Sequence, residues 1–390
     1  MSCRRKIRGC INLDLNIYDT NLNFLGIIEN YASLLWVRKY FEAGNFELVA
    51  PATEININLL KRCRLIEKPN SVEVGYISSI AIKMDVENGE FITVSGFFLT
   101  GLLARHIIYD AAQDDDLITV IDKQMGSLCK NPARIIDNLV IDYSTPINSK
   151  FNAGQKYYNL AEYATAICKS ELCGLLIKLS HDNVKPYLLL TVHYGVNRSI
   201  EQVDNPQAVF SSEFDNLLSS EYQYSEDAAA NVVYGYATVE DDVEGVTPEY
   251  LLGDGNCGFE RMETAVAVSA VTYSYTVDVF QGYNGEGAAI YKEETHKRIN
   301  QKETIDLLEA ECNNNIREIN ENMTGKVDFA GGYKKDYELG DVVTVHNPKW
   351  DILINQRIYE ITEFYENGIV SVTPIFGSPL RTIVDFLDTT

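Results

Sequence analysis

Residues 337–350, YELGDVVTVHNPKW, place several side chains capable of chemistry within one short stretch. Asp341 follows Gly340, His346 comes a few residues later, and Trp350 closes the stretch. A carboxylate and an imidazole held together can move protons or bind a metal ion. The stretch could therefore be a site, or it could be only a strand with its turns.

The structural interpretation of these residues is the one we favour. Leu339-Gly340-Asp341 is a turn signal that leads into an apolar strand from Val342 to Val345. Asn347-Pro348 ends that strand, because proline has no backbone N–H to donate to a central ladder. His346 then stands at the end of the strand, and the sequence supplies no partner for it.

The other histidines and the main acidic run do not form a recognisable metal site. His181 and His193 lack a third ligand at a metal-binding spacing, and no HExxH pattern surrounds His296. The run Asp114-Asp115-Asp116 lacks the alternating ligands and the glycine of an EF-hand loop, so it is typical of a solvated loop. We expect no bound metal.

The eight cysteines predict neither a zinc site nor a disulfide framework, because they show no CxxC pair and no regular spacing. No base can be named that would activate one of them as a nucleophile. We expect buried or idle thiols in a reducing cytosol, and no catalytic residue. The cysteines are Cys3, Cys10, Cys63, Cys129, Cys168, Cys173, Cys257 and Cys312.

Residues 253–258, GDGNCG, match the GxGxxG pattern of dinucleotide-binding proteins, and Asp278 follows at the distance of a ribose-binding acid. That pattern needs a strand before it and a helix after it. Here the following segment is rich in Val, Thr and Tyr and favours a strand, and Asp254 would bring an acid toward the pyrophosphate. We interpret the segment as a flexible glycine loop and expect no cofactor.

The overall composition is that of a globular protein with several domains. The 390 residues are 46% hydrophobic and 23% charged, enough for two or three cores of about 100 to 200 residues each. We expect no membrane segment and no standard secretion signal. The 33 bases and 56 acids give a net charge of -23, which disfavours tight nucleic-acid binding and would suit a surface past which DNA must slide.

Residues 1–105 are predicted to form a first β domain. From residue 11 onward, apolar and polar positions alternate over short runs that are broken by turn residues. Glu87-Asn88-Gly89 joins two of these runs, and Asn-Gly supplies the positive φ angles of a tight hairpin.

Residues 106–204 are predicted to be an inserted α/β module. Asn159 caps a helix that ends at Gly174, and two strands follow around an Asp182-Asn183 turn. The apolar face of the helix consists of Leu160, Tyr163, Ala164, Ile167, Cys168 and Leu172.

Residues 205–320 are predicted to begin a second β domain, which residues 321–390 complete together with a C-terminal tail. Within the first part, residues 293–320 are predicted as a polar helix with a narrow apolar stripe. Such a stripe packs either on its own domain or against a neighbouring subunit. The stripe consists of Ile305, Leu308, Cys312, Ile316 and Ile319.

Two segments far apart in the chain have the same pattern. Residues 77–98, ISSIAIKMDVENGEFITVSGFF, and residues 358–377, IYEITEFYENGIVSVTPIFG, each contain an alternating strand, a Glu-Asn-Gly hairpin, a second strand and an aromatic end. This similarity indicates two β modules of one kind.

Both ends of the chain resemble a family of phage minor tail proteins. Residues 15–51, LNIYDTNLNFLGIIENYASLLWVRKYFEAGNFELVAP, contain a Tyr-Asp turn, an aromatic stretch ending in Arg-Lys-Tyr and a Gly-x-Phe-Glu-Leu strand. YELGDVVTV followed by RIYEITEFYENGIVSVTPIFG is similar to the C-terminal end of that family. The two ends enclose nearly the whole chain, the middle matches by its order of elements, and none of these motifs is catalytic.

The resemblance implies a tail-tip or baseplate hub of a phage or a phage-tail-like particle. Such a protein is mainly β, with two related tail-tube-like β-barrel domains and an α/β module, and it assembles as a homotrimer. Its six barrels form a pseudo-sixfold ring that joins the sixfold tail tube to a threefold spike or fibre and lets DNA or the tape measure pass.

The resemblance also implies partners and a location. The partners are other copies of the chain, the tail tube or distal tail protein ring, the tape measure protein, and the central spike or fibre protein. The location is the virion tail tip or baseplate, after assembly in the host cytoplasm.

Two other functions remain open from the sequence. A tail-associated cell-wall hydrolase would need a Cys–His pair, a zinc cluster or paired carboxylates, and about a dozen residues after the last predicted strand leave no room for such a domain. A receptor- or glycan-binding tail protein would suit the 24 tyrosines, which a β-rich fold also explains as core and strand residues. We expect no enzymatic activity.

Overall fold

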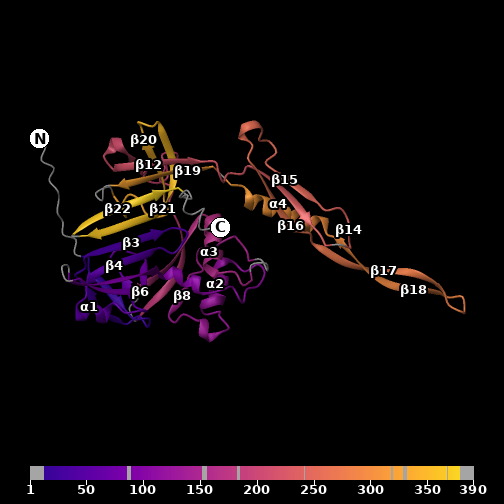
Figure 1. The fold of residues 1–390 in the computed structure, drawn as a ribbon, viewed down its shortest axis with the longest axis horizontal. Helices are drawn as coiled ribbons and strands as arrows, with labels where there is room; N and C mark the ends of the chain where they lie inside the picture. The colour runs from indigo at the N-terminus through magenta and orange to yellow at the C-terminus, as the bar shows by residue number, and fades with distance from the viewer. Residues whose placement is uncertain are drawn as a thin grey trace. The chain divides into compact units, whose positions relative to one another are not determined.

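The protein is mainly β in the computed structural model, with 48% strand and 17% helix, as predicted. The structure describes residues 13–85, 89–151, 156–181, 185–240, 242–317, 319–327, 332–366 and 368–377. The chain forms two compact units. Unit 1 contains the described residues up to Tyr222 and from Met323 onward, and unit 2 contains those from Gln223 to Asn322. Figure 1 labels the elements in chain order.

Unit 1 is built on one large sheet of thirteen strands. Their order is β12-β19-β22-β21-β3-β4-β7-β6-β5-β1-β2, and β20 pairs with both β21 and β11 beside this path. The strands are β1 (Leu15–Tyr18), β2 (Phe24–Ile28), β3 (Ser33–Lys39), β4 (Asn45–Pro51), β5 (Leu65–Glu67), β6 (Val74–Asp85), β7 (Gly89–Phe98), β11 (Val209–Ser211), β12 (Leu217–Ser225), β19 (Asn320–Val327), β20 (Val342–Asn347), β21 (Ile352–Glu366) and β22 (Ile369–Phe376).

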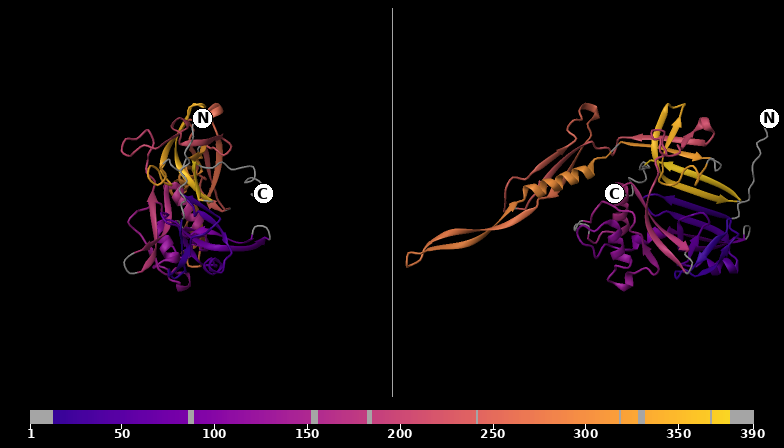
Figure 2. Two further views of the ribbon diagram at one scale, coloured as in Figure 1. Left: turned by 90° about the vertical axis from the view of Figure 1, so that its left-hand side faces the viewer. Right: turned by 180° about the vertical axis from the view of Figure 1, so that it is seen from behind.

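The N-terminal and C-terminal strands meet where β3 pairs with β21. This antiparallel register runs from Ser33 opposite Glu366 to Lys39 opposite Glu360. Figures 1 and 2 show the yellow C-terminal strands beside the indigo N-terminal ones. The described pairings leave the sheet open, so two related barrels stay a prediction.

Both predicted Glu-Asn-Gly hairpins are present in this sheet. β6 and β7 pair as far as Asp85 opposite Gly89, and β21 and β22 pair as far as Glu366 opposite Ile369. Gly89 has a φ of 88° and Gly368 has a φ of 73°, a conformation that glycine adopts at no steric cost. Residues 86–88 and 367, which include the rest of both predicted turns, lie outside the described residues.

The predicted α/β module is also part of unit 1. Its small sheet has the order β8-β10-β9 and comprises β8 (Leu139–Ile141), β9 (Cys173–His181) and β10 (Pro186–Tyr194). Two helices, α2 (Leu117–Met125) and α3 (Leu160–Ser170), share a core with it. The predicted turn at residues 182–183 lies outside the described residues.

The helix capped by Asn159 begins as predicted but ends earlier. The Asn159 side chain accepts hydrogen bonds from the backbone N–H groups of Ala161 and Glu162, and α3 ends at Ser170. Gly174 is not its cap, because it lies in β9 opposite His193. A Cβ atom at position 174 would lie 2.3 Å from the His193 ring, so glycine is needed there for close packing.

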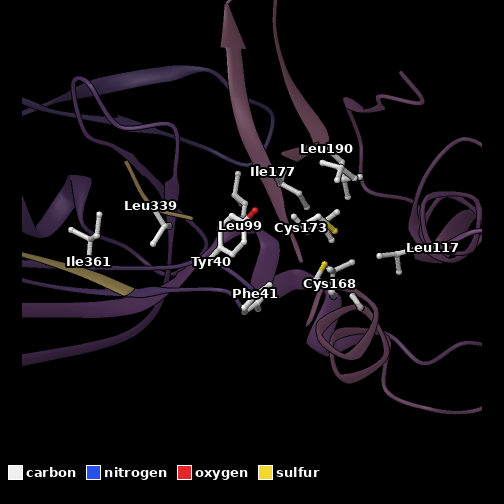
Figure 3. Packing of buried hydrophobic residues seen from close by; sticks show 14 of the residues in the cluster. Tyr40, Phe41, Leu99, Leu117, Cys168, Cys173, Ile177, Leu190, Leu339 and Ile361 are labelled. Atoms are coloured by element: carbon white, nitrogen blue, oxygen red, sulfur yellow. The ribbon is translucent and has the colours of Figure 1, made fainter. Parts of the chain in front are cut away.

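Two hydrophobic clusters fill unit 1. The larger joins the α/β module to the C-terminal strands, and Figure 3 shows Tyr40 and Phe41 between Ile361 of β21 and module residues such as Cys173. The smaller surrounds Trp36, whose ring centroid is 4.6 Å from that of Phe98. Further short elements of this unit are α1 (Glu54–Leu59), η1 (Leu99–Arg105), η2 (Pro132–Arg134) and η4 (Ser212–Phe214).

The described residues of unit 2 form two three-stranded sheets, one α-helix and a short 3-10 helix. The first sheet has the order β15-β13-β16 and the second β14-β18-β17. The elements are β13 (Val232–Thr238), β14 (Val243–Glu244), β15 (Glu249–Leu252), η5 (Gly258–Glu260), β16 (Glu263–Ser269), β17 (Thr272–Tyr283), β18 (Ala289–Ile299) and α4 (Gln301–Asn315).

The prediction of a helix over residues 293–320 was wrong in its boundaries. The segment up to Ile299 is the second half of strand β18, and α4 starts after Asn300, whose side chain accepts a hydrogen bond from Glu303 N–H. Pairing with β17 overrides the helix propensity of the charged residues before Asn300. The stripe residues Leu308 and Cys312 are buried against the β15-β13-β16 sheet, so the helix packs on its own unit.

Among the described residues, no helix has the length and apolar character needed to cross a bilayer.

Candidate functional site

The stretch YELGDVVTVHNPKW is a structural element in the fold. Gly340 has a φ of 91°, and a Cβ atom there would lie 2.1 Å from the Tyr40 ring, so only glycine fits. The buried carboxylate of Asp341 accepts hydrogen bonds from Val196 N–H at 2.8 Å and from Arg198 Nε at 2.7 Å. These bonds attach the loop after β10 to the start of β20.

His346 takes no part in a catalytic arrangement with Asp341. It lies near the end of β20 opposite Leu353, and Asn347 is the last residue of the strand, as predicted. Trp350 lies in the following turn, where its backbone N–H bonds to the Asn347 carbonyl at 3.1 Å. The turn at Leu339-Gly340, strand β20 and the turn that starts at Pro348 confirm the predicted sequence of turn, strand and turn.

His181, His193 and His296 each have different neighbours. His181 Nε2 is 2.9 Å from Glu67, and His296 pairs with a carboxylate of β14. His193 packs edge-on against Tyr40 with ring centroids 5.2 Å apart, and burial lowers its pKa. Within the ranges that the structure describes, no three His, Cys, Asp or Glu side chains gather in a way that could hold a metal ion.

The acidic run at residues 114–116 begins a helix that the sequence analysis missed. Asp116 caps α2 by accepting a hydrogen bond from Thr119 N–H at 2.7 Å. Asp115 forms an ion pair with Lys123 at 2.6 Å. This helix could have been predicted from the sequence, because an aspartate directly before a segment with apolar residues at helical spacing is a typical helix cap.

The glycine loop at residues 253–258 connects strands, as predicted. Gly253 has a φ of 82°, and a Cβ atom there would lie 1.9 Å from the Asn231 carbonyl oxygen. β16 follows the loop after a short turn, in place of the helix that a dinucleotide site would need. Asp254 is 3.4 Å from Arg261, which holds the loop from within the unit.

The described cysteines are free thiols. Cys168, Cys173 and Cys312 are buried, and Cys257 is exposed in the glycine loop.

A buried ion cluster in unit 1 is the main concentration of charged side chains that the sequence analysis did not find. Its centre is the pair Lys68 and Glu363, whose side chains are 1% and 2% exposed and whose Nζ and Oε2 atoms are 2.6 Å apart. Lys68 Nζ also lies 5.5 Å from the Trp36 ring centroid and donates to Tyr365 Oη at 3.2 Å. Burial of this pair is tolerated because every charged atom has a partner.

Arg38 extends the ion cluster along β3. Its Nε donates to Glu73 Oε1 at 2.7 Å, and its Nη1 donates to Tyr333 Oη at the same distance. Tyr333 Oη in turn donates to Glu363 Oε1 at 2.8 Å. The network therefore joins residues from the first quarter of the chain to residues near its C-terminal end.

At neutral pH, Lys68 is protonated and Glu363 is ionised in the ion cluster. Burial lowers the pKa of Lys68 to about 8, although the charge of Glu363 opposes this shift. Burial also acts to raise the pKa of Glu363, but the charges of Lys68 and Lys334 outweigh it and bring the pKa to about 2. Burial raises the pKa of Tyr333, so its hydroxyl stays protonated as a donor.

The ion cluster holds the fold together and offers no access for a substrate. Lys68 and Glu363 are closed off from solvent, and both oxygens of Glu363 are already hydrogen-bonded.

The sequence contains a pattern from which the ion cluster could have been predicted. In β3, Arg38 continues the buried positions Leu34 and Trp36, and in β21, Glu363 stands between buried Ile361 and Tyr365. A charge on the buried face of a strand indicates a paired group.

Solved structures of phage tail proteins share this fold along nearly the whole chain. The tail protein from Neisseria meningitidis MC58 has a TM-score of 0.55 at 12% identity, covering 94% of this chain and 97% of that one. The 43 kDa tail protein of prophage MuSo2 from Shewanella oneidensis has a TM-score of 0.52 at 13% identity, covering 93% and 98%. The prophage tail protein gp18 from Listeria monocytogenes EGD-e has a TM-score of 0.51 at 12% identity, covering 96% and 97%. The protein thus has a phage tail protein fold.

The sequence defines the family more closely. The family model of Siphovirus ReqiPepy6 Gp37-like proteins matches residues 14–378, and the chain belongs to that family. Among curated protein sequences, none matches the chain. The resemblance to phage tail proteins that the two ends of the sequence carried is confirmed.

Proposed function

We propose that this protein is the structural hub of a phage tail tip or baseplate, or of a phage-tail-like particle, and that it is not an enzyme. The observation that carries the proposal is the likeness to prophage tail proteins from one end of the chain to the other, which covers 96% of this chain and 97% of the Listeria protein. The chemistry-bearing residues agree with a structural role, because the Asp341 carboxylate and the ion cluster are committed to internal partners.

We further propose that three copies assemble into a pseudo-sixfold ring, with two related barrels from each chain. Residues 1–105 would form the first barrel domain, and residues 106–204 the α/β insertion. Residues 205–320 would start the second β domain and residues 321–390 complete it. The support is the repeated Glu-Asn-Gly hairpin, which occurs as β6–β7 and again as β21–β22 in one sheet.

The ring would join the sixfold tail tube, or the distal tail protein ring, to the threefold spike or fibre. It would sit at the virion tail tip or baseplate after assembly in the host cytoplasm, and DNA and the tape measure protein would pass through it. The net charge of -23 supports a passage role, because a surface with excess acids does not retain phosphates.

Native mass measurement of the purified full chain, alone and with its tail neighbours, tests the assembly. We expect a mass of three copies, with further mass added by the tube or distal tail protein. A glycan-binding screen and a wall-degradation assay on the same sample are expected to be negative. A monomer that binds a glycan or degrades cell wall would instead support one of the two alternative functions.

A further inference from the structure

A long hairpin of unit 2, formed by β17 and β18 and named here the arm, carries an exposed aromatic tip. Phe280, Tyr283 and Tyr291 are 48%, 71% and 60% exposed, and Ile290 beside them is 46% exposed. The Phe280 ring centroid lies 5.2 Å from that of Tyr283 and 5.8 Å from that of Tyr291, both in edge-to-face contacts. Figures 1 and 2 show the arm as a two-stranded ribbon that continues past β14.

The described residues provide little support for the outer half of the arm. β17 pairs only with β18, and β14 reaches β18 only at Lys297 and Arg298. The remaining backbone groups along the outer edges of both strands have no strand beside them within the described residues. Because an isolated two-stranded hairpin is at best marginally stable in water, such an arm is expected to be covered in the assembled state. Clustered exposed aromatic side chains are typical anchors of protein interfaces.

The charge distribution points to another copy of the same chain as the partner. Two chains that each carry a net charge of -23 repel, and like surfaces meet most easily where the charge is lowest. Residues 279–292 form the tip and contain one acid, Glu286, and one base, Lys292, so their formal charge is zero. The tip therefore combines apolar anchors with a local charge that does not oppose self-association.

The two edges of the arm also differ in a way that suits a ring. β17 contains a single charged residue, Asp278, whereas β18 contains two charged runs, Lys292-Glu293-Glu294 and Lys297-Arg298. If the β17 edge of one copy faces the β18 edge of the next, the contact is head-to-tail. Such a heterologous contact closes into a ring when the rotation between copies allows it.

We propose that the arms of neighbouring copies pack on one another through their aromatic tips, and that this contact is a second point of assembly besides the barrel ring. The inference rests on the trimer proposed above. The tip of each arm contributes Phe280, Tyr283 and Tyr291 to a shared apolar cluster, which removes the exposed rings from water.

Cysteine cross-linking in the full chain tests the contact directly. Gly285 has an ordinary φ, and a Cβ atom there would meet nothing within 4 Å, so Gly285→Cys adds a thiol at the tip without strain. Gly255→Cys is the matched control in the same unit, because its Cβ would also meet nothing within 4 Å. Both variants carry Cys257→Ser, and the Cys257→Ser parent gives the background of the other thiols.

We expect mild oxidation to produce covalently linked copies from the Gly285→Cys variant, at about ten times the yield from the Gly255→Cys control.

A second variant, Phe280→Ser/Tyr283→Ser/Tyr291→Ser, is expected to raise the concentration at which the trimer dissociates by about tenfold or more in sedimentation experiments. Its control, Tyr109→Ser/Phe214→Ser/Phe259→Ser, removes three exposed aromatic side chains elsewhere and is expected to leave dissociation unchanged.

The two proposals fail in distinguishable ways. A wild-type trimer with no cross-link at residue 285 and no effect of the tip substitutions overturns the arm contact and leaves the trimer standing. A wild-type chain that remains monomeric overturns the trimer, and the arm contact with it.

Discussion

At position 363, strand β21 places a carboxylate on its buried face, between Ile361 and Tyr365. An unpaired carboxylate at such a position would cost several kcal/mol, and here Lys68 provides the counter-charge. Lys68 and Glu363 are far apart in sequence, so the local pattern around Glu363 could not identify Lys68 as its partner. That Glu363 faces the core could have been predicted, because every second residue of a strand points to the same face.

Replacing Glu363 by glutamine is expected to destabilise unit 1 by about 3 kcal/mol at neutral pH, because it leaves the Lys68 ammonium buried without its counter-charge. Chemical unfolding followed by the combined fluorescence of Trp36 and Trp350 measures the change. The control is Glu366→Gln, an exposed position at the end of the same strand. Equal stabilities of the two variants would contradict a structural role of the ion cluster.

The ion cluster also predicts how stability depends on pH. The pKa of Glu363 falls from its ordinary value of 4.5 to about 2 in the fold, because Lys68 and Lys334 stabilise its charge. Its contribution to stability is therefore complete above pH 4.5 and is lost as pH falls toward 2. We expect the free energy of unfolding of the wild type to decrease over this range by up to about 3 kcal/mol from this residue. The Glu363→Gln variant should show a correspondingly smaller decrease. Parallel pH profiles of the two proteins would refute the assignment.

The turn before β20 gives a second test at the residue scale. Gly340→Ala forces a Cβ atom toward the Tyr40 ring at a φ of 91°, and we expect a loss of about 2 kcal/mol or more in the free energy of unfolding. Gly285→Ala, at a position with open space and an ordinary φ, is the matched control and should be close to neutral. A tolerated Gly340→Ala substitution would show that the close approach to Tyr40 is not required.

At the scale of elements, local signals predicted the structure where they act alone. The Asn-Gly hairpins formed because glycine supplies the positive φ at Gly89 and Gly368, and α3 begins at Asn159 because its side chain caps the first turn. The boundary at Asn300 was missed because the charged residues before it suit a helix in isolation. Pairing of β18 with β17 decides their structure, and that pairing is not visible locally.

Unit 2 behaves as an insertion in the order of elements, which gives a prediction for truncated chains. Both hydrophobic clusters of unit 1 draw only on residues up to Leu217 and from Met323 onward, and β12 lies next to β19 in its sheet. Replacing residues 226–319 by a short Gly-Asn-Gly linker should therefore leave unit 1 folded. We expect one cooperative thermal transition within about 5 °C of the transition assigned to unit 1 in the full chain. An unfolded product would show that unit 1 depends on the inserted residues.

At the scale of the whole molecule, the pairing of the N-terminal strands with the C-terminal strands could not be predicted from sequence patterns. The contact between β3 and β21 joins residues that are between 321 and 333 positions apart, from Lys39 with Glu360 to Ser33 with Glu366, and nothing in either strand specifies the other. The resemblance of the two ends to tail proteins supplied that information indirectly. The structural role of YELGDVVTVHNPKW, in contrast, followed from the turn residues and Pro348 alone.

The excess of acids leads to a prediction about nucleic acids. With a net charge of -23, the full chain is expected to show no saturable binding to double-stranded DNA at about 0.15 M salt in a mobility-shift assay. Lysozyme or another basic protein at the same concentration serves as the positive control. Tight, salt-sensitive binding would mean that some Lys and Arg side chains cluster into a phosphate-binding surface despite the negative net charge.

The central claim concerns where this protein lies in the assembled particle and how many copies of it are present. Cryo-electron microscopy of the assembled tail, with the chain located by its fold, measures both at once. The hub proposal predicts three copies around the tail axis, each contributing two barrels to a closed ring between the tail tube and the spike or fibre. Six copies, or a chain located away from the tail axis, would contradict it.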